Sequence, residues 1–180
     1  MIACIGLLYI VLSWLAGWYL LTKWRNKDFL SISRHAATSL QTRLLFAVVL
    51  VGLGAVFYGW LGFWLAPRLG LDIAFRILIG ITFVLQAVTG LVPDIQGWKR
   101  TVHKLAAWSM ALMFLLIGWA LSLASNQTKV SQLVCLVLAS YMVAGVLAVL
   151  SRRYKAHFLW LQASYVLALE LIVLVSAYLR

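Results

Sequence analysis

Long, almost unbroken runs of apolar residues constrain this chain more than any other feature. A run of about 20 predominantly apolar residues can cross the hydrocarbon core of a bilayer as an α-helix. The runs are Ile2–Thr22, Leu44–Leu65, Ile73–Val92, Leu105–Ala124, Val130–Leu150 and Phe158–Leu179. Because they are continuous and do not alternate with a period of two, they predict helices and not the strands of a membrane barrel.

Little sequence remains outside these runs, so we expect one domain over residues 1–180. Its predicted fold is an all-α integral membrane bundle of six transmembrane helices with short loops. The composition agrees, since 65% of the residues are hydrophobic and only 11% are charged. An average soluble protein has about 25% charged residues, and a soluble fold could not cover its core with so few.

The distribution of charge predicts the orientation of the bundle. Eleven basic residues fall in or beside the first, third and fifth connections: Lys23, Arg25, Lys27, Arg34, Arg43, Lys99, Arg100, Lys104, Arg152, Arg153 and Lys155. Four lie elsewhere: Arg68, Arg76, Lys129 and Arg180. Short loops rich in Lys and Arg stay in the cytoplasm. We therefore expect a cell-membrane protein with both termini outside, whose net charge of +11 serves membrane lipids and not nucleic acid.

Two further expectations concern the first span and the cysteines. No charge precedes the first span, whereas a signal peptide has a positive region before its apolar core, so we expect an uncleaved anchor. Cys4 and Cys135 lie within spans and are expected to be free thiols.

Small residues in the second span predict a helix-packing face. Gly52, Ala55, Gly59 and Gly62 follow one another at spacings of three, four and three. This spacing places them on one side of an α-helix, where small residues allow another membrane helix to approach closely.

The third connection gathers the polar residues that the spans avoid. Pro93 and Gly97 turn the chain, and Asp94 and His103 flank the start of the fourth span. We expect Asp94 to organise this turn, either by accepting bonds from backbone amides of the fourth span or by pairing with His103. We also expect His103 to point into the bundle.

The other histidines, His35 and His157, fall at the same end of the predicted bundle. Histidine beside a carboxylate can bind a metal or carry out acid–base chemistry, but histidine at the membrane surface is more often simply solvated. No metal-type spacing such as His-x-x-x-His occurs, and the histidines lie at helix ends, where they do not suit haem. We therefore predict neither a metal nor a cofactor.

Glu170 is the one acidic residue deep within a span. An ionisable group at that depth is costly and marks a candidate functional site. The alternative is a protonated carboxyl that bonds to a neighbouring helix, with Gln86 of the third span as its partner.

The order of these motifs resembles a known family. Ser31, His35 and Ala36 follow the first span, Val92, Pro93 and Asp94 end the third, and His103 opens the fourth with Ala106 and Ala107. This layout resembles a bacterial and archaeal six-span family of unknown function, numbered nine-nine-eight, which is itself distantly similar to the eukaryotic Frag, DRAM and Sfk group. The family usually has an acidic residue after the serine, whereas this chain has Arg34 and His35. The resemblance implies the six-span architecture and a lipid-related role.

Three functions follow as hypotheses. The first is a lipid-interacting membrane protein with a polar patch around Asp94 and His103 at the cytoplasmic face. The second is a membrane-embedded enzyme that acts on a lipid or a lipid-linked group through those residues, with His35, His157 and Glu170 as further catalytic candidates. The third is an accessory subunit that packs against other membrane subunits, or against a second copy, through its small-residue faces.

Overall fold

The chain folds into long apolar helices. The computed structural model describes residues 2, 4–23, 31–151 and 157–179, and all regular secondary structure within these ranges is helical. Six helices are long and apolar enough to cross a membrane. The protein is therefore a multi-pass membrane protein with six candidate spans, as the sequence predicts.

The long helices follow the predicted runs closely. Five of them are single elements: α1 (Cys4–Lys23), α6 (Ile73–Leu91), α7 (Trp98–Ser122), α8 (Lys129–Leu150) and α9 (Phe158–Tyr178). The second span is one helix, Leu40–Arg68, divided into α3 (Leu40–Ala47), η1 (Val48–Leu53), α4 (Gly54–Trp60), η2 (Leu61–Leu65) and α5 (Ala66–Arg68). A short helix, α2 (Ile32–Ala36), precedes it.

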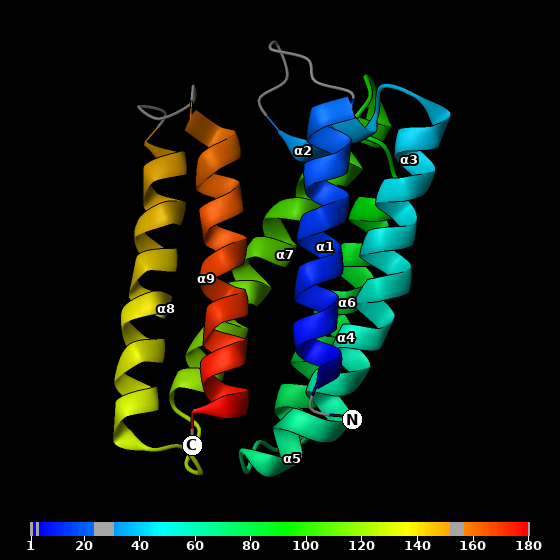
Figure 1. The fold of residues 1–180 in the computed structure, drawn as a ribbon. Helices are drawn as coiled ribbons and strands as arrows, with labels where there is room; N and C mark the ends of the chain where they lie inside the picture. Colours follow the sequence, from blue (N-terminus) through cyan, green and yellow to red (C-terminus); the bar gives the residue numbers. More distant parts are fainter. Residues whose placement is uncertain (1, 3, 24–30, 152–156, 180) are drawn as a thin grey trace.

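The bundle consists of two groups of three long helices. The second span packs against α1 and α6 in one group, and α7, α8 and α9 pack together in the other. The hairpin formed by α6 and α7 joins the groups, and α1 also contacts α9. Both termini lie at one end of the bundle, and α2 lies at the opposite end (Figure 1).

The end that carries α2 is also the basic end. The described part of the first connection and the third connection lie there, and with them Lys23, Arg34, Arg43, Lys99, Arg100 and Lys104. The remaining basic residues predicted for this end, Arg25, Lys27, Arg152, Arg153 and Lys155, lie outside the described residues, as does Arg180. Of the nine described basic residues, six thus lie at this end, and Arg68, Arg76 and Lys129 lie at the other.

The second span departs from regular α-helix. Val48–Leu53 and Leu61–Leu65 are π-helical, so each holds more residues per turn than an α-helix and shifts the register of the residues beyond it. The predicted packing face does not form one continuous close contact. Gly52 and Ala55 are exposed, Gly59 is half-buried and Gly62 is buried, but a Cβ added at Gly59 or Gly62 would meet nothing within 4 Å.

The close helix contact of this span lies instead at Gly54. A Cβ there would come within 2.6 Å of Nε2 of Gln86 on α6. Gln86 is buried, donates from Nε2 to the carbonyl of Leu50 at 2.8 Å, and accepts a hydrogen bond from the hydroxyl of Tyr58 at 2.8 Å. Gly54 thus leaves room for a polar side chain that joins α6 to the π-helical turn.

Alanine substitutions at two glycines of this span test whether the close helix contact lies at Gly54 or at the predicted face. Gly54→Ala should lower the free energy of unfolding by about 1 kcal/mol, because Gln86 must move and lose a buried hydrogen bond. Gly59→Ala is the control and should be neutral or slightly stabilising, since alanine favours helix. Unfolding of both variants in mixed micelles measures this, and equal stabilities would contradict the packing described for Gly54.

Candidate functional site

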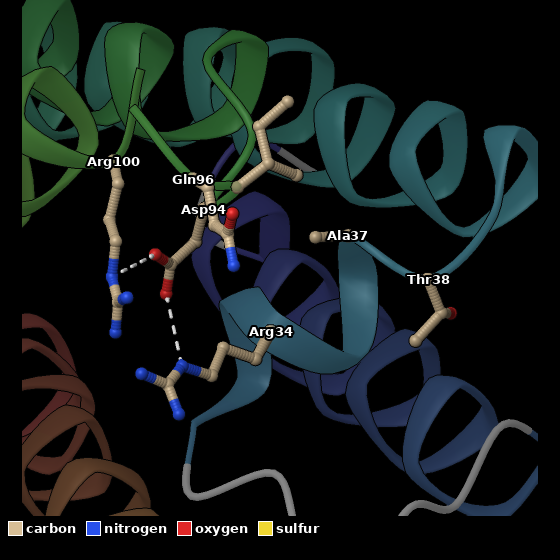
Figure 2. A pocket seen from close by; sticks show the side chains of 7 residues that line it. Arg34, Ala37, Thr38, Asp94, Gln96 and Arg100 are labelled. Atoms are coloured by element: carbon tan, nitrogen blue, oxygen red, sulfur yellow. Dashed lines mark ion pairs between the residues drawn. The ribbon is translucent and has the colours of Figure 1, made fainter. Parts of the chain in front are cut away.

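The candidate site forms where the third connection meets α2. Helix α6 ends at Leu91, Pro93 follows, and Gly97 has a φ of +83° immediately before α7. This left-handed conformation favours glycine, so Gly97 allows the sharp return of the chain. The turn directs Asp94 towards α2 and the beginning of α7 (Figure 2).

Asp94 is the centre of the site. Its side chain is only 6% exposed, and its two oxygens face Nε of Arg34 at 3.7 Å and Nε of Arg100 at 3.6 Å. The hydroxyl of Ser33 donates to Oδ2 at 3.5 Å. A single buried carboxylate therefore links α2, the turn and α7. The prediction that Asp94 organises the third connection agrees with this geometry, but its partners are arginines.

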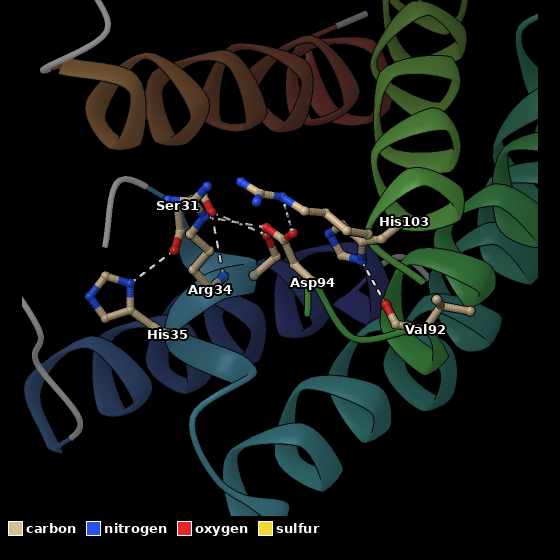
Figure 3. Close-up of polar contacts among 8 residues, drawn as sticks. Ser31, Arg34, His35, Val92, Asp94 and His103 are labelled. Atoms are coloured by element: carbon tan, nitrogen blue, oxygen red, sulfur yellow. Dashed lines mark hydrogen bonds and ion pairs between the residues drawn. The ribbon is translucent and has the colours of Figure 1, made fainter. Parts of the chain in front are cut away.

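The capping of α2 positions Arg34. Ser31 is the N-cap, and its hydroxyl accepts a hydrogen bond from the Arg34 amide at 3.4 Å. The buried imidazole of His35 donates from Nδ1 to the carbonyl of Ser31 at 2.9 Å (Figure 3). Both contacts hold this five-residue helix in place, and they give His35 a role in positioning α2.

His103 points into the bundle, as predicted, and is 3% exposed. It does not bond to Asp94: Nδ1 donates to the carbonyl of Val92 at 2.7 Å (Figure 3). The last carbonyls of a helix lack intrahelical partners, and Val92 follows the end of α6, so the imidazole satisfies one of them. The guanidinium groups, which are always charged, pair with the carboxylate instead. The predicted pair of Asp94 with His103 is thus replaced by two separate contacts.

Among the described residues, most of the hydrogen-bonding capacity of the two arginines is unused. Both approach Asp94 through Nε, and Figure 2 shows their outer nitrogens extending beyond the carboxylate. Oδ1 of Asp94 and Nε of Arg100 are buried and lack a hydrogen bond among the described residues. The guanidinium groups are therefore held close to the carboxylate by charge, with their outer amino groups available to a ligand.

Two adjoining spaces surround this network. The arginine hollow, about 440 Å³, is lined by Arg34, Thr38, Asp94, Gln96 and Arg100, with Ala37 and Ile95. The side recess, about 270 Å³, lies between α3 and the end of α6 and is lined mainly by apolar residues, with His103 among them. Ala37 and Asp94 line both spaces. The site thus places a cationic hollow directly beside an apolar recess.

The remaining candidates lie apart from this site. His157 is exposed and precedes α9. Glu170 is buried far from the turn and accepts hydrogen bonds from Nε1 of Trp14 at 2.5 Å and from the hydroxyl of Ser13 at 3.4 Å. It joins α9 to α1, so the predicted pairing with Gln86 is wrong. Across the described ranges, no three His, Cys, Asp or Glu residues gather in a way that could hold a metal ion.

The sequence predicts Asp94 as the central residue of this site but does not predict that Arg34 and Arg100 are its partners. Arg34 and Arg100 were assigned to the basic loops as lipid-contacting charges, and Trp14 was not singled out at all. One local feature of the sequence could have singled out Arg34. It lies three residues after the capping Ser31, and the start of a helix fixes the direction in which a side chain at that position points. No local signal connects Arg34 with Asp94, which lies in a different connection of the chain.

No protein-family model, curated protein or solved structure matches the chain. The similarity to the six-span family therefore stays a resemblance in layout and in Pro93, Asp94 and His103. The six candidate spans follow from the length and apolar composition of the described helices.

The role of the carboxylate can be tested by removing its charge alone. Asp94→Asn keeps the shape of the side chain but should lower the free energy of unfolding by about 1 kcal/mol, because a buried carboxylate loses its charge contacts with two partly exposed arginines. Asp72→Asn is the matched control: Asp72 is the exposed N-cap of α6 and accepts from the amides of Ala74 and Phe75, and asparagine caps about as well. Equal stabilities of the two variants in detergent would contradict an organising role for Asp94.

Proposed function

We propose that the protein binds an anionic membrane lipid, with the phosphate of the headgroup in the arginine hollow. The observation that carries this proposal is the geometry of Arg34 and Arg100. One buried carboxylate holds both guanidinium groups by Nε, and their outer amino groups remain free. A pair of amino groups on one guanidinium suits two oxygens of a phosphate, which makes arginine well adapted to such anions.

The charge of the hollow favours an anion. Two guanidinium groups surround one carboxylate, so the group is net positive. Arg34 and Arg100 are 34% and 38% exposed, whereas Asp94 is 6% exposed. A ligand that enters from outside therefore meets the cations first.

The position of the hollow favours a lipid over a dissolved anion. Asp94 follows the apolar helix α6 by only a few residues, so it lies where the hydrocarbon core gives way to the headgroups. Trp98, at the start of α7, is 69% exposed, and tryptophan prefers this interface. The apolar side recess opens beside the hollow, as an amphiphilic ligand requires.

We further propose that the basic end faces the cytoplasm, because short basic loops stay on that side. A cysteine at exposed Gln96, in a Cys4→Ala background, should then react with an impermeant reagent only from the cytoplasmic side. A cysteine at Asn126, at the opposite end, should react only from outside. The reverse pattern would place the hollow in the other leaflet.

Lipid retention tests the proposal. Wild-type protein in native mass spectrometry should retain phosphatidylglycerol over phosphatidylcholine with the same chains. Arg34→Gln and Arg100→Gln should each weaken retention about tenfold, since a hydrogen bond to a charged group contributes about 1.5–3 kcal/mol. Arg76→Gln makes the same chemical change at the opposite end and should have no effect. Retention that is equal in all three variants would overturn the proposal.

A further inference from the structure

The arginine hollow and the side recess lie next to each other and share Asp94 in their walls. Asp94 faces Arg34 and Arg100 on one side and lines the recess on the other, together with Ala37. A molecule bound across this boundary would have its anionic part on the arginines and its apolar part between α3 and α6. This arrangement favours an amphiphilic ligand with an anionic group at one end of an apolar chain.

A hydrogen-bond acceptor lies between the two surfaces. His103 lines the recess and is 3% exposed. Its Nδ1 donates to the carbonyl oxygen of Val92, which leaves Nε2 as the ring nitrogen that can accept a hydrogen bond from a ligand. Nε2 is directed away from Val92 (Figure 3) and has no hydrogen-bond partner among the described residues. A nitrogen that lines the recess without a partner favours a ligand that supplies a hydroxyl donor.

The apolar part of the recess accepts one chain. Leu40, Leu44 and Leu91 line it and are 71%, 57% and 65% exposed, so the recess opens sideways towards the bilayer. Its volume of about 270 Å³ is below the roughly 300–1,000 Å³ of typical ligand pockets. This space fits a segment of one hydrocarbon chain, and a second chain would have to lie outside the recess.

We propose that the ligand is a single-chain lipid phosphate with a free hydroxyl between the phosphate and the chain, that is, a lysophospholipid. Its phosphate contacts Arg34 and Arg100, its glycerol hydroxyl donates to Nε2 of His103, and its chain lies in the side recess. This inference rests on the proposed function, since it names the lipid that the arginine hollow holds. It adds selectivity for the hydroxyl and for one chain, which the arginines alone do not provide.

Changes in the ligand test this without altering the protein. Three probes are compared on wild-type protein in a neutral maltoside detergent: 1-acyl lysophosphatidylglycerol, its 2-deoxy analogue and diacyl phosphatidylglycerol with the same chain. We expect the lysolipid to bind about tenfold more tightly than the deoxy analogue, as one hydrogen bond to a buried acceptor implies. We also expect it to bind more tightly than the diacyl lipid.

A second experiment fills the side recess with a larger side chain. Ala47 lines the side recess, so Ala47→Phe should weaken binding of the lysolipid severalfold. Ala55→Phe is the matched control, because Ala55 is exposed on the same long helix and does not line the recess. Thermal unfolding confirms that both variants are folded.

The outcomes separate the two proposals. Equal affinities for the three probes that are still weakened by Arg34→Gln and Arg100→Gln would overturn the lysolipid assignment and leave the headgroup site intact. Affinities that do not depend on either arginine would overturn the headgroup site itself. No effect of Ala47→Phe relative to Ala55→Phe would show that the chain lies elsewhere, which also contradicts the lysolipid assignment.

Discussion

The basic end of the bundle depends on one buried carboxylate. A carboxylate removed from water is costly unless it is paired, and Asp94 meets this requirement with two guanidinium groups from separate parts of the chain. These contacts both stabilise the fold at this end and position the two cations. The same contacts that fix α2 against the turn before α7 also fix two cations on one carboxylate, and both arginines line the same hollow.

The polar contacts of Gln86 and Glu170 differ from the Asp94 network because they lie among packed helices. Gln86 bonds to a carbonyl of the π-helical turn and to Tyr58, and Glu170 bonds to Trp14 across the contact between α1 and α9. Within a membrane, such contacts satisfy groups that water cannot reach. Both sets lie among packed helices, whereas the Asp94 network borders two open spaces. This difference is the reason to place the functional site at the turn and not at Glu170.

The sequence predicts much of this fold because the bilayer permits few alternatives. Six apolar runs had to be helices, and the proline and glycine around Asp94 had to form a turn. The inward direction of His103 also followed from its place at the start of a span. The packing face of the second span did not, because π-helical turns at Val48–Leu53 and Leu61–Leu65 change a register that was counted as α-helical. The pairing of Asp94 with Arg34 required tertiary structure, since the two residues lie in different connections.

The central claim is that Arg34 and Arg100 contact a lipid phosphate together. Dipolar recoupling between phosphorus and nitrogen in solid-state NMR measures this directly, with ¹⁵N-labelled arginine in bilayers that contain lysophosphatidylglycerol. We expect phosphorus to dephase two guanidinium signals. One of these signals should be missing from the spectrum of the Arg34→Lys variant and the other from that of Arg100→Lys, which assigns them to the two arginines. Dephasing confined to other arginines, or none at all with the lipid present, would contradict it.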